Sequence, residues 1–331
     1  MSLRLLNSST IKAEASRLGF FACGMAKAEP VCDEEARKLR HWLDNHGHAN
    51  MEYMARNIEI RLNPQLLLDN AKTIISVALN YAPARHIPSG EPQLAAYALG
   101  KDYHDIMRSK LHQLASAIGL RQNDDDVTNG EPLYRACVDT APILERYWAE
   151  KAGLGWRGRN CQLIIPQAGS MFFLGEIITD ADVDIYDTPA PSRCASCHAC
   201  IDACPTGALA SDCFFDSSLC LSYQTIENRE DNLPDNIGEA MGETFYGCDR
   251  CQQACPWNRF AKPNTTPELQ PSDGLIGMTW EKWQNLTEEE YRKLFRGSAV
   301  KRAKYKGLMR NIRAITKPKQ ELLTNNNKKI E

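Results

Sequence analysis

The cysteine spacing between Cys194 and Pro256 constrains the fold of this chain more than any other feature of the sequence. The stretch begins with C-A-S-C-H-A-C-I-D-A-C-P and ends with C-D-R-C-Q-Q-A-C-P. The first run has the C-x2-C-x2-C-x3-C-P spacing with which proteins hold a pair of iron–sulfur clusters. Three of its cysteines bind one cluster, and the fourth, which precedes the proline, binds the other. The stretch therefore predicts two [4Fe–4S] clusters in one small domain.

The second run ends like the first but has one cysteine fewer, so one ligand has to come from elsewhere. Cys220 is the nearest upstream candidate apart from Cys213, and we assign Cys220. The expected ligands of one cluster are Cys194, Cys197, Cys200 and Cys255. The expected ligands of the other are Cys204, Cys220, Cys248 and Cys251. A pair of zinc sites is the alternative, because structural zinc also uses C-x2-C pairs.

The composition is that of an ordinary globular protein in a reducing compartment. The chain has 331 residues, 43% hydrophobic and 24% charged, which predicts two or three domains with a sizeable core. Its 13 cysteines are an odd number, which argues against a disulfide framework. Clusters and free thiols need reducing conditions, so we expect a cytoplasmic protein. The first ten residues lack the apolar core of a signal peptide, and no stretch is apolar enough to cross a membrane.

Charge is distributed unevenly along the chain. The net charge is −3, yet residues 291–331 contain thirteen Lys and Arg and only two Glu. A basic segment on an acidic body is typical of a protein that binds a polyanion. A solvated basic helix that binds nothing is the alternative.

The residues before the cysteines predict a domain of mixed helices and strands. Thr73–Tyr81 is apolar on both faces, which is typical of a central strand. Leu163–Pro166 and Met171–Thr179 predict two more strands joined by a turn. Glycines on both sides of Trp156 would let the backbone approach either another strand or a flat ligand.

Asp139 is the candidate catalytic residue of this region. It follows a short apolar strand and stands three residues before Pro142, a pattern that is also typical of an ordinary helix N-cap. The functional interpretation is a carboxyl group held in a pocket as a proton donor. Asp102 has the pattern of an N-cap too, at the start of a helix that begins near Tyr103.

Two proline-bearing stretches predict the domain boundaries. Residues 180–191 are acidic and look like a linker, and residues 262–274 look like a second connector. We therefore expect an α/β domain over residues 1–185, a double-cluster domain over 186–262 and a helical C-terminal segment with a basic tail over 263–331. Within that segment, Thr287 and Glu290 predict a capping box, and a last helix is expected over Ala299–Ile315.

Together these features resemble the epoxyqueuosine reductase family, cobalamin-dependent iron–sulfur enzymes of queuosine synthesis in tRNA. Besides the cysteine framework, five motifs carry the resemblance. They are V-D-T-A-P at 138–142, A-G-L-G-W-R-G-R-N at 152–160, S-Y-Q-T-I-E at 222–227, G-C-D-R-C-Q-Q-A-C-P-W-N at 247–258 and A-K-Y-K-G-L-M-R-N at 303–311. The motifs are spread over nearly the whole chain, and their combination is more specific than a ferredoxin motif.

The resemblance implies an α+β fold. A nitroreductase/reductive-dehalogenase-like cobalamin-binding domain would precede a ferredoxin-like domain with two [4Fe–4S] clusters and a short, helical, basic C-terminus. Cobalamin would lie between the two domains, with no histidine on its cobalt, and the clusters would supply its electrons. The enzyme would reduce epoxyqueuosine to queuosine at the wobble position of tRNA. A low-potential donor of unknown identity would feed a monomeric protein.

The resemblance also implies roles for single residues. Asp139 matches the proton donor of the family, and Cys220 agrees with its eighth cluster ligand. The positions expected at the cobalamin are Arg61, Tyr103, Asp139, Asn160, Ser222, Cys248 and Asp249. A proton donor must keep its proton near neutral pH, so we expect burial to raise the pKa of Asp139.

The end of the chain departs from many members of the family. Those members continue into HEAT-like helical repeats, whereas only about twenty residues follow Asn311 here. The basic residues of Arg292–Lys319 are then expected to contact the phosphates of tRNA.

Two other functions compete with this one. A cobalamin-dependent reductase of a small molecule, similar to reductive dehalogenases, would not need the basic tail and would be expected to carry a Tat signal. An electron carrier with two clusters would not need the large first domain.

Overall fold

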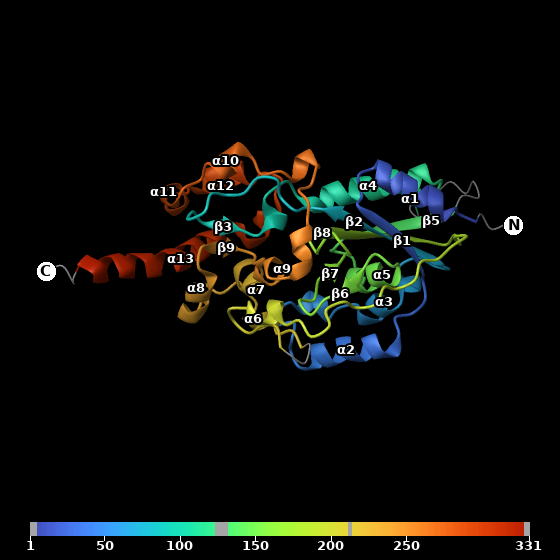
Figure 1. Cartoon of the computed structure of the whole chain (residues 1–331), viewed down its shortest axis with the longest axis horizontal. Helices are drawn as coiled ribbons and strands as arrows, with labels where there is room; N and C mark the ends of the chain where they lie inside the picture. The colour runs from blue at the N-terminus through green and yellow to red at the C-terminus, as the bar shows by residue number, and fades with distance from the viewer. Residues whose placement is uncertain (1–4, 123–131, 211–213, 328–331) are drawn as a thin grey trace.

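The structure is a computed structural model that describes residues 5–122, 132–210 and 214–327, with side chains described as far as Ile315. Cys213 and most of the polar loop expected over residues 122–132 lie outside the described residues. The molecule is elongated, with its termini at opposite ends (Figure 1). A sheet-containing half carries the N-terminus, and a mainly helical half carries the C-terminus.

A five-stranded sheet with the order β1-β2-β8-β5-β4 organises the first half. Its strands are β1 (Ala22–Lys27), β2 (Thr73–Asn80), β8 (Phe172–Thr179), β5 (Leu133–Cys137) and β4 (Arg121–Gln122). Neighbouring strands are antiparallel except β4, which is parallel to β5. The strand expected at Thr73 is confirmed as an interior strand that is buried along almost its whole length.

Helices cover both faces of this sheet (Figure 1). On one face, α1 (Ser8–Arg17) and α4 (Tyr103–Ala117) pack against the side of β2 that carries Val77. On the other, α2 (Asp33–Asp44), α3 (Ile58–Leu62) and α5 (Glu145–Lys151) share a core with Ala78. Two successive residues of β2 serve two different cores because side chains alternate along a strand.

A close approach fixes α5 on the sheet. A side chain on Gly24 of β1 would collide with the backbone carbonyl of Ala152, the residue that caps the C-terminal end of α5. Glycine at this position therefore lets α5 lie directly on the strands, and the loop that precedes α5 is held at the edge of the same face.

A separate two-stranded ribbon is formed by β6 (Trp156–Arg157) and β7 (Leu163–Ile164). A side chain on Gly155 would collide with the carbonyl of Ile164, so this glycine serves the approach of two strands. The two strands expected at Leu163–Pro166 and Met171–Thr179 are confirmed as β7 and β8, of which β7 pairs with β6 and β8 enters the main sheet. An isolated bridge between Ile165 and Gly169 remains at the turn.

A third core builds the second half around buried aromatic residues such as Tyr246 and Trp283. The parallel pair β3 (Gln93–Leu94) and β9 (Thr244–Tyr246) links it to the chain before α4. Ile87 and Leu99 also belong to this core. The core of the second half therefore contains residues from before the boundary expected at residue 185 and from after the boundary expected at residue 262. The two domain boundaries stay a prediction.

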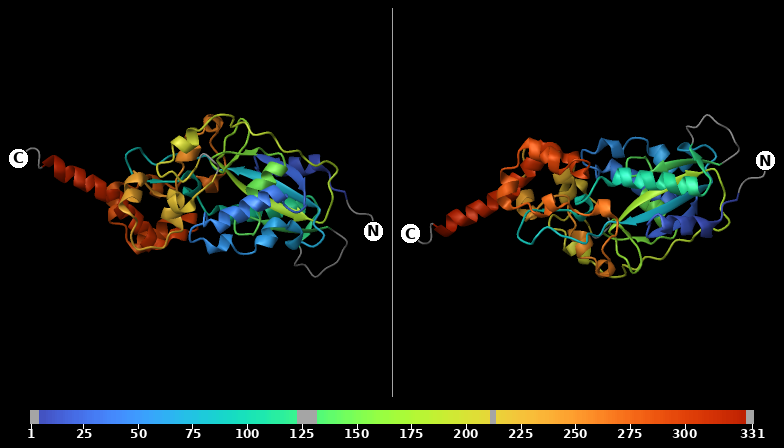
Figure 2. Two further views of the ribbon diagram at one scale, coloured as in Figure 1. Left: turned by 90° about the horizontal axis from the view of Figure 1, so that it is seen from below. Right: turned by 90° about the horizontal axis from the view of Figure 1, so that it is seen from above.

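Short helices make up most of this second half. They are α6 (Ala199–Asp202), α7 (Leu221–Ile226), α8 (Asp235–Met241), α9 (Arg250–Gln253), α10 (Asp273–Ile276), α11 (Trp280–Gln284) and α12 (Glu288–Leu294). The capping box of Thr287 and Glu290 is confirmed at the start of α12. The chain ends in α13 (Lys304–Asn327), which is longer than expected and projects from the body in all three views (Figures 1 and 2).

Single 3-10 turns connect many of these elements. They are η1 (Glu52–Met54), η2 (Pro64–Leu66), η3 (Ala96–Ala98), η4 (Ser217–Leu219), η5 (Pro256–Phe260), η6 (Pro267–Leu269) and η7 (Ala299–Ala303). Among the helices that the structure describes, none is both long and apolar enough to span a membrane.

Candidate active site and cluster ligands

Asp139 lies in the loop between β5 and α5, beside the first turn of α4. Its Oδ2 accepts a hydrogen bond of 2.7 Å from the hydroxyl of Tyr103 and lies 3.1 Å from Nε2 of His104. The backbone of Asp139 has φ 39°, and its side chain is 54% exposed. The helix begins only at Glu145, so the N-cap interpretation of Asp139 is wrong. The carboxyl group is accessible and is held by two side chains from the first turn of α4.

His104 connects two carboxylates. Its Nδ1 lies 2.6 Å from Oδ1 of Asp102, and its Nε2 reaches Asp139. Hydrogen bonds to Asp102 and then to Asp139 raise the pKa of His104 to about 9. The imidazole is therefore protonated at neutral pH, with an acceptor for each N–H. Asp102 is also the expected N-cap of α4, because its side chain accepts from the backbone N–H of His104.

The pKa of Asp139 is shifted in the direction opposite to expectation. Burial raises this pKa, but hydrogen bonds from His104 and Tyr103 outweigh burial and the net shift is downward. The expectation of a burial-raised pKa is therefore wrong for this arrangement. The cause is His104, which the sequence interpretation did not assign to the site although it directly follows Tyr103.

Two glutamates behind Asp139 were also missed. Oε1 of Glu145 accepts a hydrogen bond of 2.5 Å from the backbone N–H of Asp139. Burial, followed by the charge of Asp139, raises the pKa of Glu145 to about 7. Glu176 is completely buried in β8, and burial raises its pKa well above the usual range. The signal for Glu176 was a single acid inside the apolar strand F-F-L-G-E-I-I-T, because unpaired charges are rarely buried.

Tyr103 and Arg61 both lie near Asp139, and their expected role at cobalamin stays a prediction. The ring of Tyr103 stacks on Phe173 with centroids 4.2 Å apart. Arg61 donates to the carbonyl of Tyr53, and the charge of Asp139 acts on its pKa, which burial lowers. The guanidinium of Arg302, from the C-terminal half, lies 5.8 Å from the centroid of Tyr53. Both halves of the molecule therefore border the site.

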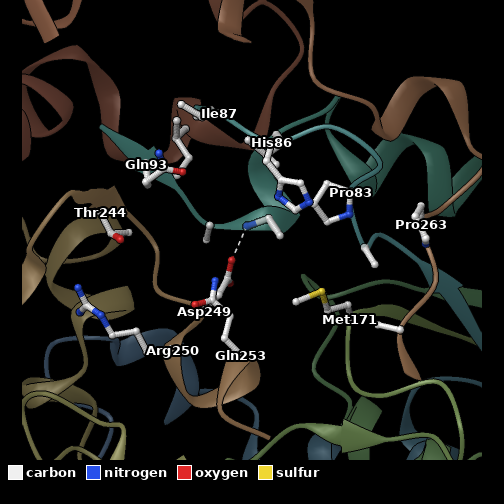
Figure 3. A pocket seen from close by; sticks show the side chains of 16 residues that line it. Pro83, His86, Ile87, Gln93, Met171, Thr244, Asp249, Arg250, Gln253 and Pro263 are labelled. Atoms are coloured by element: carbon white, nitrogen blue, oxygen red, sulfur yellow. Dashed lines mark hydrogen bonds between the residues drawn. The ribbon is translucent and has the colours of Figure 1, made fainter. Parts of the chain in front are cut away.

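A cavity of about 420 Å³ lies between the two halves and contains Asp249 in its wall (Figure 3). Oδ2 of Asp249 accepts a hydrogen bond of 2.6 Å from the backbone N–H of Ala96, and burial raises the pKa of this carboxyl to about 6. The lining also carries Gln93, Arg250 and Gln253. These groups alternate with apolar ones, which suits a large ligand with peripheral amide groups.

The other expected cobalamin positions differ in their surroundings. Asn160 is buried, and its Nδ2 donates to the carbonyl of Cys251, so it holds a cluster loop instead of lining this cavity. Ser222 lies in the first turn of α7, and Cys220 is the residue that precedes this helix. Cys248 packs against the third core next to Asp249.

The structure brings together the four cysteines that the spacing assigns to one cluster. Burial raises the pKa of Cys255, and the nearby thiols of Cys194 and Cys197 add to this shift. Burial likewise raises the pKa of Cys200, with contributions from Cys255 and Cys194. The indole Nε1 of Trp156 lies 3.4 Å from Sγ of Cys194 and donates to it. N–H donors to sulfur are common around cluster ligands and tune their potentials.

The second group of four also assembles, with Cys220 as a member. Burial raises the pKa of Cys220, and the nearby thiols of Cys248 and Cys204 raise it further. Burial raises the pKa of Cys251 to about 12, with contributions from thiols of both groups. The two groups are therefore neighbours. In the described parts of the chain, no three His, Cys, Asp or Glu side chains are close enough to hold a single metal ion, so the groups are open.

Comparison with protein families gives two matches. Residues 61–140 match the family model described as epoxyqueuosine reductase QueG, DUF1730. Residues 193–258 match the model of a 4Fe-4S double cluster binding domain, which favours clusters over the zinc alternative.

Curated relatives cover nearly the whole chain. An epoxyqueuosine reductase of Cellulophaga algicola is 42% identical over 312 residues, which are 94% of this chain and 99% of the relative. That of Escherichia coli is 37% identical over 308 residues, 91% of this chain and 78% of the relative. The chain belongs to the epoxyqueuosine reductase family.

Solved structures of epoxyqueuosine reductases confirm the expected α+β fold. One of them, in complex with an epoxyqueuosine-modified tRNA-Tyr stem loop, matches with a TM-score of 0.82 and 29% identity, covering 93% of this chain and 80% of that chain. The Bacillus subtilis enzyme, in a structure whose catalytic aspartate loop is swung out of the active site, matches with a TM-score of 0.79 and 27% identity over the same shares.

Proposed function

We propose that this protein reduces epoxyqueuosine to queuosine in the wobble position of tRNA, in the cytoplasm and as a monomer. The observation that carries the proposal is the near-complete match to epoxyqueuosine reductases. The exposed carboxyl group of Asp139, hydrogen-bonded by Tyr103 and contacted by His104, supports it. The relatives are oxidoreductases by name, and a domain that binds two iron–sulfur clusters can supply the electrons that a reductase needs.

We assign the two groups of four cysteines as ligands of two [4Fe–4S] clusters and propose cobalamin as the third cofactor. The polar cavity beside Asp249 and the neighbouring Cys248 fit a large amide-bearing ligand close to a cluster. Asp249 and Arg250 would hold such a ligand from the C-terminal half. When bound, cobalamin supplies a strong two-electron nucleophile, which no amino-acid side chain provides.

The residues around Asp139 would handle protons. Removal of the epoxide oxygen breaks both C–O bonds, consumes two electrons and two protons, and releases water. Asp139 would protonate the leaving oxygen, with Tyr103 and His104 fixing the orientation of its carboxyl group. Protonated His104 would also compensate the negative charge that forms on the oxygen.

Exposed cations close to the site support a tRNA partner. The backbone N–H of Asp102 donates to the carbonyl of Gly297, and Nζ of Lys101 reaches the carbonyl of Arg296. The segment that carries Arg296 and Lys301 thus borders the start of α4. Not all of the expected basic residues are available for phosphates, since Arg310 is buried and hydrogen-bonded to backbone carbonyls.

The test is nucleoside mass spectrometry of tRNA that carries epoxyqueuosine. The tRNA is incubated anaerobically with the protein, its clusters reconstituted, in the presence of a strong reductant and with or without cobalamin. Loss of one oxygen only with cobalamin is the expected result. No conversion by protein with intact clusters would overturn the proposal and favour a reductase of small molecules.

A further inference from the structure

Asp139 needs a proton source of its own. The reaction consumes two protons, and one carboxyl group delivers one proton at a time. In this structure the pKa of Asp139 is lowered, so its carboxyl group is ionised at neutral pH. A neighbouring acid that keeps its proton would recharge it. The inference below rests on the proposed reduction.

Glu145 is the acid nearest to this loop. Its Oε1 accepts the hydrogen bond from the backbone N–H of Asp139, so the two residues are in direct contact. The carboxyl group lies at the first residue of α5, on the side of Asp139 that faces the sheet core. The carboxyl group of Glu145 thus contacts the backbone of the residue whose side chain it would recharge.

Glu176, in β8, is the fully buried acid of this arrangement. It lies opposite Ser76 of β2 and Cys137 of β5, on the sheet face that α5 covers. Its two carboxyl oxygens are buried, as are Oγ of Ser76 and Nε1 of Trp148, and none of them has a hydrogen-bond partner among the described residues. A buried carboxyl group without a partner is far more stable neutral than charged.

We propose that half-buried Glu145 and fully buried Glu176 form a pair of acids that stores protons behind Asp139, with Glu145 as the member that passes its proton to Asp139. Each transfer moves one proton and no electron, from a carboxyl oxygen of Glu145 to a carboxyl oxygen of Asp139. Glu145 is left as a carboxylate, which Glu176 or solvent reprotonates. Glu145 acts through Asp139 and is a positioning and proton-supplying residue.

The charges around Glu145 determine how it titrates. The titratable groups that face it come from α4, β5, β8, the catalytic loop and α5 itself: Tyr103, His104, Cys137, Glu176, Asp139 and Arg146. Burial and the charge of Asp139 raise the pKa of Glu145 to about 7, while Arg146 and His104 oppose the shift. Of the two acids, Glu145 is therefore the one that holds a proton near neutral pH. An acid with such a pKa holds its proton below about pH 7 and loses it above.

The first test is the pH dependence of a single turnover with pre-reduced enzyme. Glu145→Gln keeps an oxygen that accepts from the loop but has no proton to give. We expect its rate to fall at least tenfold and the wild-type decline above about pH 7 to disappear. Glu176→Gln should slow turnover less than Glu145→Gln does, because solvent can also reprotonate Glu145. Glu150→Gln, an isosteric change on the same helix, is the control and should behave as wild type.

The second test does not depend on activity. Difference infrared spectroscopy of the resting protein should show the carbonyl band of a neutral carboxylic acid that disappears as the pH rises through about 7. That band should be absent in Glu145→Gln, and a second, persistent band should be absent in Glu176→Gln. A wild-type pH profile in Glu145→Gln, or an unchanged titrating band, would overturn the inference. If wild type itself converts no tRNA, the proposed function fails, while the infrared titration still decides the state of the acid pair.

Discussion

Asp139 depends on its neighbours for its charge and its orientation. His104 lies between Asp102 and Asp139 and stabilises the ionised form of both. The hydroxyl of Tyr103 fixes the same oxygen that His104 contacts. The chemistry of the carboxyl group is thus set by side chains from α4, about 35 residues earlier in the chain.

Replacing Asp139 by Asn should abolish turnover while both clusters stay in place. The amide still accepts a hydrogen bond but cannot donate a carboxyl proton, so a rate loss of roughly 100- to 10,000-fold is expected. Queuosine formation and iron content are measured in parallel. Asp105→Asn is the matched control, since Asp105 is an exposed acid in the same first turn of α4. Turnover at the wild-type rate would remove Asp139 from the mechanism.

Replacing Cys220 by Ala should remove one cluster. Cys220 supplies the ligand that the second cysteine run lacks, so iron should fall from about eight to about four atoms per chain. Iron analysis and electron paramagnetic resonance of the reduced protein measure the change. Cys32→Ala should keep all the iron, because Cys32 is exposed and belongs to neither group. Unchanged iron in Cys220→Ala would move the ligand to Cys213.

At the level of elements, α13 is fastened to the cluster half by buried polar side chains. Arg310 donates to the carbonyls of Gln224, Asn228 and Glu230. Nδ2 of Asn311 donates to the carbonyls of Thr225 and Phe245. The R-N pair at the end of the last motif therefore joins α13 to α7 and β9. From the sequence alone, this pair was placed in a basic tail.

Asn311→Leu should destabilise the protein. The change leaves two buried carbonyl groups without their donor, which costs roughly 2–4 kcal/mol at about 1–2 kcal/mol for each group. The midpoint of thermal unfolding under anaerobic conditions should fall by several degrees. Lys306→Ala removes only an exposed ion pair with Asp231 and should shift the midpoint little. Equal midpoints for the two variants would contradict this role of Asn311.

At the scale of the whole molecule, the site belongs to neither half alone. The sheet half supplies Asp139, Tyr103 and Arg61 of α3, and the helical half supplies the cysteines, Asp249 and Arg302. The bidentate ion pair of Arg302 with Glu227 holds that guanidinium beside Tyr53. We therefore expect a tRNA that reaches Asp139 to contact the basic segment of the other half as well.

The double variant Arg296→Gln and Lys301→Gln should weaken tRNA binding without base preference. Phosphate contacts release counterions, so the slope of log affinity against log salt should decrease by about one to two. Binding of modified and unmodified tRNA is measured between low and physiological salt. Arg37→Gln with Arg40→Gln on α2 is the matched control for charge. Equal slopes for the two double variants would exclude Arg296 and Lys301 from the interface.

The sequence by itself determined the parts of this protein that depend on local spacing. Cysteines at x2 and x3 intervals must lie on one short turn, so the two groups were predictable, as were the interior strand at Thr73 and the capping box at Thr287. The motifs also sufficed to indicate the family, whereas the role of Asp139 as proton donor stays a prediction.

Only the tertiary structure decided the electrostatics of the site. His104, Glu145 and Glu176 come from α4, α5 and β8, and each looks ordinary in its own segment. Folding brings His104 within 3.1 Å of the carboxyl group of Asp139 and Glu145 against its backbone, and it buries Glu176 in the sheet behind them. The pairing of β7 with β6 and the packing of Ile87 in the core of the C-terminal half were also decided by the tertiary structure. A strand's partner is chosen by packing and not by its own residues.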